Sequence, residues 1–324
     1  MSRLRRAAAD FGMLFLLPAT IALLPWRVGF ALLKRLARSP RLLRAATDPA
    51  WEAARPYLGA ADELDWKFRF RLLRLVDHAD VYLALLRGRR WRARNLVAHG
   101  DWPAPGAGVL LTFHWGAGWW IWPELGAHGI AAHFLARQPQ GRSLGLTRVS
   151  HAFGRLREWA MHRSGGAGAL FTGGSSAKIA EAFAQRHAVV GMLDLPPAAG
   201  QRALPVTVLG REARFPYGLL RLAAAANVPV TLFSVGLNVA DGTRDMRIET
   251  LPAGLAPEAA LARYAAHLDA RLRDTPAYWQ IWREAAALFT PAAGCAGDAA
   301  PYNTDTHPLA DGAASGSTAR RTSP

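Results

Sequence analysis

The sequence contains one cysteine, Cys295, among 324 residues. A single cysteine excludes a disulfide within the chain, and it excludes a zinc site built from several thiolates. Cys295 lies in a stretch rich in glycine and alanine, without surrounding groups that would lower its pKa. We therefore do not expect it to act as a nucleophile.

Motifs of several common enzyme classes are also missing. The chain has neither the Gly-x-Ser-x-Gly elbow of α/β hydrolases nor a glycine-rich dinucleotide fingerprint. The segment FTGGSSAKIAEAF (171–183) looks like a phosphate loop but lacks the full spacing. Ser175 or Ser176 as the N-cap of a helix explains it more simply. Hydrolase and dehydrogenase functions therefore have no support in the sequence.

Acidic residues are scarce. The chain has 24 Asp and Glu against 39 Lys and Arg, all but three of them arginine, and a net charge of +15. Such an excess indicates an anionic partner: nucleic acid, anionic lipid or an acidic protein. No helix-turn-helix or zinc finger is visible, and the arginines are spread from Arg3 to Arg283. We therefore expect a membrane surface and an acidic protein as partners, and no nucleic acid.

The N-terminus contains the longest apolar run, FGMLFLLPATIALLPWRVGFALL (11–33). It is long enough to cross a bilayer, but Pro18, Pro25 and Arg27 interrupt it and both flanks are basic. It lacks the short apolar core and clear cleavage site of a signal peptide. We expect a helical anchor, spanning or lying along the membrane; the alternative is a buried helix of a soluble protein.

The order of apolar patterns predicts the fold. After helical periodicity up to the Gly/Pro-rich boundary at 100–108, short apolar runs alternate with helical stretches. Such alternation predicts an α/β fold with a mainly parallel central sheet flanked by helices. We expect a membrane-associated N-terminal helix over 1–40, an α/β domain over 41–290 and a disordered tail over 291–324. Expected strands lie at 108–114, 131–136, 168–172, 188–195, 204–209, 229–237 and 246–251.

Two polar residues stand where expected strands end. His114 follows VLLTF and Asp194 follows VVGML. Ligands of open α/β sheets bind at the carboxyl ends of strands, which makes both residues candidates for a site. The alternative for His114 is a hydrogen-bonded histidine of the core. We expect the two side chains to line one cleft, in contact directly or through one water molecule.

The chain resembles the bacterial lipid A biosynthesis acyltransferases in six blocks, taken in order. The first, LVAHGDWPAPGAGVLLTFHWGAGWW (96–120), resembles the segment that carries their His-x4-Asp/Glu motif. The others are FLARQP (134–139), GRLR (154–157), VVGMLDLPP (189–197), ALPVTVLGREARFPYGLLRLAAAANVPVTLFSV (203–235) and AYWQIWRE (277–284). The resemblance covers residues 1–290 and implies a glycerolipid-acyltransferase-like fold.

The resemblance also implies an activity. Members of this family move an acyl chain from the thioester of acyl carrier protein, or of coenzyme A, to a hydroxyl of a lipid-like acceptor. The histidine acts as general base, which implies this role for His114. The matched blocks add Arg155 and Asp194 as catalytic residues. The thioester is a co-substrate, so no cofactor or metal is implied, and the implied location is the cytoplasmic face of a bacterial inner membrane.

This chain departs from the family motif at one position. Trp119 stands where the motif has its acid, five residues after His114. Glu124 lies too far along the expected helix to replace that acid, so we expect Asp194 to orient the imidazole and Trp119 to pack against its face. The tryptophans of this segment either belong to the core or line an acyl groove. We expect substrate binding by Arg137, Arg157, Trp119 and Trp120. The missing acid also leaves open a catalytically silent homologue that binds carrier protein or lipid.

Overall fold

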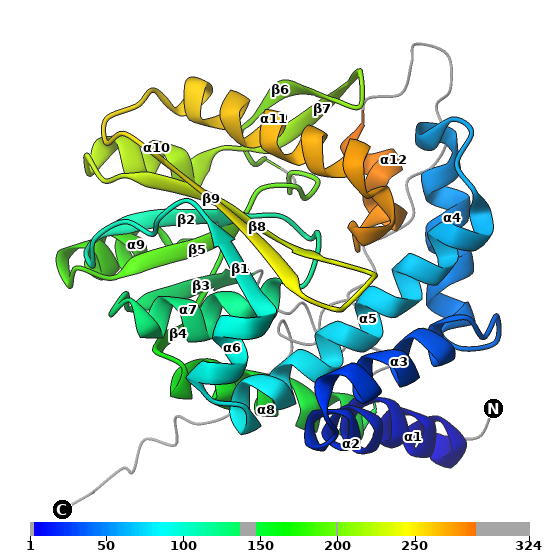
Figure 1. The fold of residues 1–324 in the computed structure, drawn as a ribbon. Helices are drawn as coiled ribbons and strands as arrows, with labels where there is room; N and C mark the ends of the chain where they lie inside the picture. The colour runs from blue at the N-terminus through cyan, green and yellow to red at the C-terminus, as the bar shows by residue number, and fades with distance from the viewer. Residues whose placement is uncertain (1–2, 137–146, 199, 290–324) are drawn as a thin grey trace, which may run out of the picture.

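The computed structural model describes residues 3–136, 147–198 and 200–289. The expected tail over 291–324, with Cys295, and the expected substrate-binding residue Arg137 lie outside these ranges. The described part of the chain contains a central sheet and the helices around it (Figure 1).

A seven-stranded sheet forms the centre of the protein, in the order β1-β9-β8-β2-β5-β3-β4. Strands β2, β3, β4, β5 and β8 are parallel to one another, whereas β8 and β9 pair antiparallel. The bounds are β1 (Leu96–His99), β2 (Gly108–Thr112), β3 (Ala132–Ala136), β4 (Gly166–Phe171), β5 (Ala188–Met192), β8 (Val230–Leu237) and β9 (Arg244–Leu251). The predicted α/β fold with a mainly parallel sheet is confirmed.

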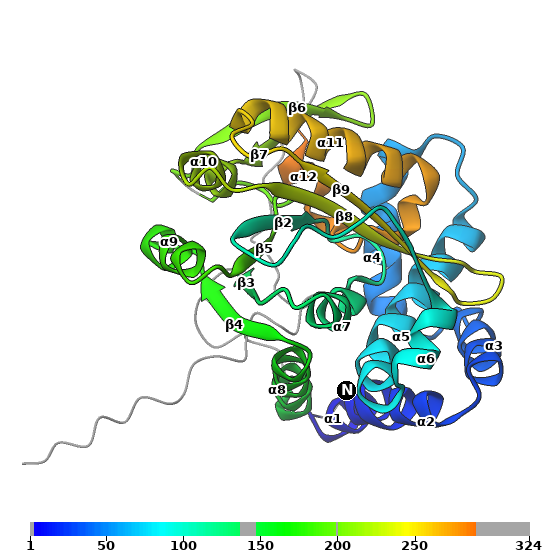
Figure 2. The same cartoon turned by 60° about the vertical axis from the view of Figure 1, so that its left-hand side comes forward.

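Helices cover both faces of this sheet, so its central strands are apolar throughout. All five residues of β2, GVLLT, are buried. On one face lie α9 (Ser176–Ala184), α10 (Gly218–Ala225) and α11 (Pro257–Asp274), and on the other α7 (Ile121–Ala127) and α8 (Arg148–Arg163) (Figure 2). Ser175 is the N-cap residue of α9, as expected, although its side chain makes no capping hydrogen bond.

Three strands differ from the expectation, one in its pairing and two that were not expected. The expected strand at 204–209 is β6 (Ala203–Val208), but it pairs with β7 (Arg211–Pro216) in a separate two-stranded sheet. A tight turn joins the two strands, since Leu209 and Gly210 both have positive φ, 53° and 71°. The first strand of the central sheet, β1, was not expected, because it has only four residues and three of them are exposed.

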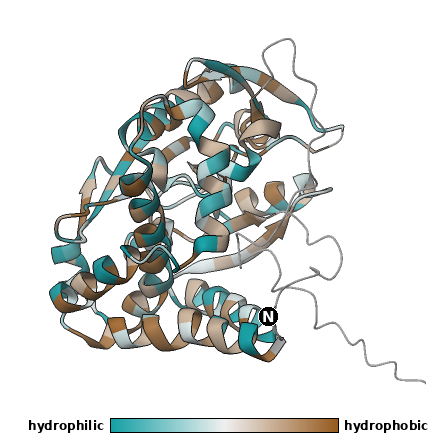
Figure 3. Cartoon of the chain, turned by 90° about the vertical axis from the view of Figure 1, so that its right-hand side faces the viewer, coloured by the Kyte–Doolittle hydropathy of each residue, from teal (hydrophilic) through white to brown (hydrophobic). Residues whose placement is uncertain are grey.

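The N-terminal apolar run is helical. One part of it is buried, as in a core helix, and another part is exposed, as a membrane anchor would be. α1 (Arg3–Phe11), the π-helix η1 (Gly12–Leu16) and α2 (Leu17–Leu23) follow one another, and α3 (Trp26–Ala37) begins after Pro25. Inner residues such as Ile21 and Phe30 are buried, whereas Phe11, Leu16 and Leu23 are more than half exposed. Figure 3 shows apolar residues recurring along these helices at the base of the view.

One helical stretch of the described chain, Leu4–Leu23, is long and apolar enough to cross a membrane. Only 17% of its apolar window is buried within the structure. Length and composition therefore allow membrane contact here, and they are also compatible with a signal sequence or a core helix.

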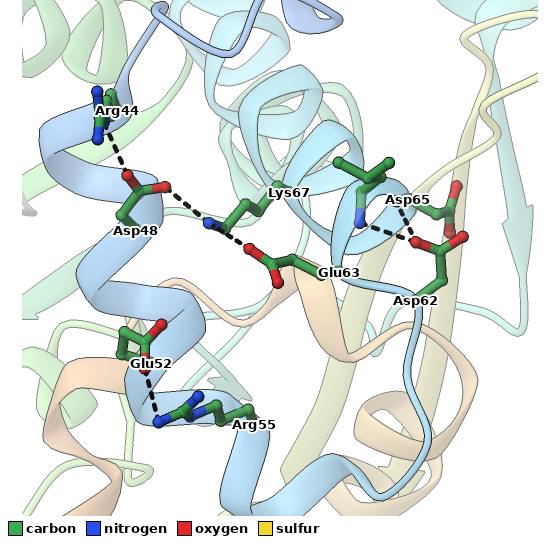
Figure 4. Close-up of polar contacts among 9 residues, drawn as sticks. Arg44, Asp48, Glu52, Arg55, Asp62, Glu63, Asp65 and Lys67 are labelled. Carbon is green, nitrogen blue, oxygen red and sulfur yellow. Dashed lines mark hydrogen bonds and ion pairs between the residues drawn. The ribbon is translucent and has the colours of Figure 1, made fainter.

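The helices α4 (Arg44–Leu58) and α5 (Glu63–Leu86) are joined at one end by charged side chains (Figure 4). Lys67 lies between Asp48 of α4 and Glu63 of α5, at 2.8 and 2.7 Å. The carboxylate of Asp62 caps α5 by accepting from the backbone N–H groups of Leu64 and Asp65. These contacts fix the start of the long helix that passes beneath the end of the sheet.

The other end of α5 is fixed by a fully buried ion pair. Asp80 of α5 binds the guanidinium of Arg244 at the start of β9, and both side chains are 0% exposed. The guanidinium also lies over the Trp26 ring, 4.4 Å from its centroid. A buried charge without its partner is costly, so this pair holds α3, α5 and β9 in one arrangement.

We predict that Asp80→Ala destabilises the protein by about 3–5 kcal/mol, because it leaves Arg244 buried and uncompensated. Asp48→Ala, which removes a partly exposed partner of Lys67, is expected to cost no more than about 1 kcal/mol. Urea denaturation followed by circular dichroism measures both. Equal losses from the two variants would contradict a special role of the buried pair.

Candidate active site

His114 and Asp194 meet at the carboxyl end of the sheet. His114 lies two residues after β2 and Asp194 two residues after β5, and these strands are parallel neighbours. Nδ1 of His114 is 2.9 Å from Oδ1 of Asp194, and the backbone N–H of His114 donates to Oδ2 at 2.8 Å. The predicted contact between the two side chains is confirmed, and it is direct. The expectation that both line one cleft is wrong for Asp194, because its carboxylate is fully buried and only His114 lines the cavity.

Two further side chains hold the Asp194 carboxylate, which is fully buried. The indole N–H of Trp279 donates to Oδ2 at 2.8 Å. The Tyr264 hydroxyl lies 3.4 Å from Oδ1, but its proton has a closer acceptor in the carbonyl oxygen of Thr112, at 2.9 Å. The same hydroxyl accepts from the backbone N–H of Leu193 at 2.9 Å. Tyr264 therefore fastens the ends of β2 and β5 beside the carboxylate.

These contacts determine the ionisation of Asp194. Burial by itself raises the pKa of the carboxyl group, but the charge of His114 and the hydrogen bonds from His114 and Trp279 together outweigh it, and the pKa lies below its ordinary value of 3.8. An ionised carboxylate only accepts hydrogen bonds, so Nδ1 of His114 carries the proton. In the neutral ring Nε2 is then the acceptor, which is the tautomer that a general base requires.

A cavity of about 340 Å³ lies beside His114. Its walls come from the end of the sheet, from α1 and η1, and from α5 and α8. Apolar side chains such as Leu14, Leu73, Trp122 and Phe134 line most of it. This size and an apolar lining with a few polar groups are typical of small-molecule sites.

The two arginines of the GRLR block lie on opposite faces of α8. Arg157 is 4% exposed, lines the cavity and binds Asp77 at 2.9 Å. Arg155 is exposed and does not line the cavity, so its expected catalytic role is not supported by its position. Residues two apart in a helix point about 200° apart, which is why only one of the pair can face the site.

The tryptophans after His114 divide in the same way. Trp119 lines the cavity, whereas Trp120 stacks on Trp91 in the core, with ring centroids 5.2 Å apart. The position of Trp120 therefore does not support its expected contact with substrate. Trp119 lies beneath the guanidinium of Arg157, which is 4.8 Å from its ring centroid. The predicted packing of Trp119 against the His114 ring stays a prediction.

Glu124 binds Arg92 at 2.7 Å, in agreement with its exclusion as the missing acid.

Several site residues were not identified from the sequence. Arg74, Asp77 and His78 of α5 line the cavity, and Gln280 joins them from the segment after α11. Burial lowers the pKa of His78 to about 4, so this histidine is neutral at pH 7. A spacing of three and four residues on an otherwise apolar helix face was the one available signal.

Within residues 3–136, 147–198 and 200–289, no three His, Cys, Asp or Glu side chains are grouped so that they could hold a metal ion. The charged and titratable groups that line the cavity are His114, with Asp194 behind it, three arginines, the carboxylates of Asp10 and Asp77, and the neutral His78. Such a set can move a proton and bind an anion.

We predict that Asp194→Asn lowers the free energy of unfolding at pH 7 by about 2 kcal/mol or more, because it weakens charge-assisted hydrogen bonds in a buried site. The folded-state pKa of Asp194 lies below the unfolded value of 3.8. Its stabilisation is therefore complete above that value and is lost as the pH falls through the folded-state pKa. Urea titrations from pH 7 to pH 3 should show the difference from the unmodified protein shrinking below about pH 4. A difference independent of pH, or an equal loss in the exposed control Asp101→Asn, would contradict it.

A comparison of the chain with protein-family models finds no match. A comparison with curated proteins finds none either.

Proposed function

We propose that this protein is an acyltransferase that moves an acyl chain from a carrier thioester to a hydroxyl of a lipid-like acceptor. The observation that carries the proposal is the His114–Asp194 pair at the end of an apolar cavity. The pair supplies a base in the correct tautomer, and the cavity supplies space for an apolar chain. The order of the sequence blocks supports the same class of reaction.

The reaction follows from the roles of the two residues. Nε2 of His114 takes the proton of the acceptor hydroxyl as the oxygen attacks the thioester carbonyl carbon. A C–O bond forms, the C–S bond breaks, and the imidazolium returns its proton to the leaving thiolate. Asp194 keeps the ring in place and stabilises the imidazolium while it exists.

The position of the cavity supports a lipid-like acceptor. Met13 and Leu14 of the π-helix η1 line it, and Phe11 and Leu16 on the same segment are exposed by 53% and 62%. Tyr82 of α5 donates to the carbonyl oxygen of Leu14 at 2.8 Å, which holds this segment over the cavity. The membrane-facing helix and the site are thus one unit, as expected for an enzyme whose acceptor comes from the bilayer.

The charge of the protein supports the remaining parts of the proposal. A net charge of +15 favours both anionic lipid and an acidic donor such as acyl carrier protein, with coenzyme A as the alternative carrier. The proposed location is the cytoplasmic face of a bacterial inner membrane, where these two partners meet.

The second candidate is a catalytically silent protein that binds carrier protein or lipid. Trp119 in the position of the motif acid favours it. The direct contact of Asp194 with His114 argues against it, because the imidazole has its orienting carboxylate from another strand. A measurement of acyl transfer distinguishes the two candidates, because only the acyltransferase would form product.

We predict that His114→Ala lowers transfer of a labelled acyl chain, from loaded acyl carrier protein to a membrane lipid extract, by about 10²–10⁴-fold, the usual contribution of a general base. Asp194→Asn is expected to lower the rate as well, because the imidazole loses the acceptor that fixes its tautomer. Scintillation counting of the extracted lipid measures both rates.

The matched control is His151→Ala, which removes an exposed histidine of α8. It should leave the transfer rate unchanged. Identical rates for His114→Ala and the unmodified protein would remove His114 as the base. Carrier-protein binding without any turnover in the unmodified protein would favour the silent candidate.

We predict that Phe11→Gln with Leu16→Gln weakens binding to vesicles of phosphatidylethanolamine and phosphatidylglycerol by about tenfold or more, since two apolar side chains no longer enter the bilayer. Flotation of the full chain with the vesicles measures this binding. Leu64→Gln, which changes a side chain 78% exposed at the start of α5, is the control and should bind normally. Equal flotation of all three proteins would contradict membrane contact through this segment.

A further inference from the structure

Three arginines line the cavity beside His114, and two of them, Arg74 and Arg157, come from the helices α5 and α8. Arg157 of α8 binds the carboxylate of Asp77 at 2.9 Å, and Arg74 of α5 reaches the side-chain oxygen of Gln280 at 3.4 Å. Arg74 and Asp77 are three residues apart on α5, so both arginines lie around one carboxylate.

Hydrogen-bond donors of this group are left unused. Nε of Arg74, Nε of Arg157 and the indole Nε1 of Trp119 are all buried and have no hydrogen-bond partner among the residues that the structure describes. A buried donor without an acceptor costs free energy, and native structures keep such groups few. Such atoms also occur elsewhere in the described chain, for example Nε1 of Trp66 and Nε1 of Trp102, but those of Arg74, Arg157 and Trp119 belong to side chains that line one charged cavity, where a ligand with acceptor oxygens would satisfy them.

The cavity also has an excess of positive charge. Its described lining contains the three arginines Arg6, Arg74 and Arg157 against the two carboxylates Asp10 and Asp77. Asp10 accepts a hydrogen bond from Thr147 at 2.6 Å, at the start of α8. Burial lowers the pKa of Arg74, and the charge of Arg157 lowers it further despite the nearby Asp77. A negatively charged ligand would relieve this repulsion.

Arg157 is already oriented for such a ligand. Its guanidinium lies over the rings of Trp119 and Phe153, 4.8 and 5.9 Å from their centroids, and Asp77 holds one Nη atom. A side chain that is 4% exposed and held on several sides loses little conformational entropy when it binds. Trp119 therefore acts as a positioning residue for the arginine.

We propose that Arg74 and Arg157 form an anion-binding subsite for a phosphate ester, with Trp119 holding Arg157 in place. A phosphate ester offers several oxygens and up to two charges, enough to accept from two guanidinium groups at once. This inference deepens the proposed function, since the phosphate would belong to one of the two substrates. It comes either from the thiol-bearing arm of the acyl carrier or from the headgroup of the lipid acceptor.

Binding of hexyl phosphate to the full-length protein in a neutral detergent tests the subsite by calorimetry. Arg157→Gln and Arg74→Gln should each raise the Kd at least tenfold. Arg155→Gln, which changes the exposed arginine of the same helix, should leave the Kd unchanged. Thermal melting of each variant checks the fold, and Arg74→Gln keeps the test valid if the more buried Arg157→Gln fails to fold. An unchanged Kd in a folded Arg74→Gln or Arg157→Gln, or hexanoate binding as tightly as hexyl phosphate, would overturn the proposal.

Competition against hexyl phosphate separates the two sources. Displacement by phosphopantetheine assigns the subsite to the acyl donor, and displacement by dihexanoyl phosphatidic acid assigns it to the acceptor. Displacement by neither would mean binding at high probe concentration only and would overturn the proposal. Binding is measured without turnover, so retained anion binding in a protein without transfer activity would reject the acyltransferase and leave the subsite intact.

Discussion

A fully buried carboxylate, that of Asp194, accepts hydrogen bonds from parts of the chain that are far apart in sequence. His114 approaches it from the end of β2, and Trp279 from the segment after α11, with the Tyr264 hydroxyl beside it. A buried charge is tolerated only where such donors replace water. The geometry of this site therefore exists only when the sheet, α11 and the segment that carries Trp279 are assembled.

The backbone around His114 serves the same arrangement. Its carbonyl oxygen accepts from the N–H of Gln280 at 2.6 Å, and the N–H of Gly116 donates to the carbonyl oxygen of Tyr278 at 3.0 Å. Gly116 has φ +83°, and a Cβ there would lie 2.0 Å from the carbonyl oxygen of Val235. Only glycine allows so close an approach to β8. The small residues after the histidine thus let the chain turn tightly over the end of the sheet and leave the cavity beneath it.

Features of the site that depend on neighbouring residues in the sequence could be predicted from it, whereas features that depend on tertiary packing could not. The ends of apolar strands placed His114 and Asp194 together, because parallel neighbours end at one edge. Which of Arg155 and Arg157 faces the site depends on which side of α8 is turned toward the cavity. The resemblance of the sequence blocks does not give that orientation. The hydroxyl of Tyr264 and the charged residues of α5 reach the site only through tertiary packing. The spacing of Arg74, Asp77 and His78 puts them on one face of the helix, but it does not tell which part of the protein that face packs against. The pairing of β6 with β7 was missed because an apolar run does not tell which sheet a strand joins.

This packing offers a physical account of Trp119 at the position where the sequence resemblance leads us to expect an acid. Asp194 already occupies Nδ1 of His114, so a second carboxylate on the following turn would add a negative charge to a poorly solvated site without gaining a new role. An indole at that position adds no charge and offers a face to Arg157 instead. The orienting carboxylate thus comes from the neighbouring strand, and the motif position contributes to the orientation of the arginine. A change that looks like the loss of a catalytic residue in the sequence is, in the folded protein, compatible with a complete site.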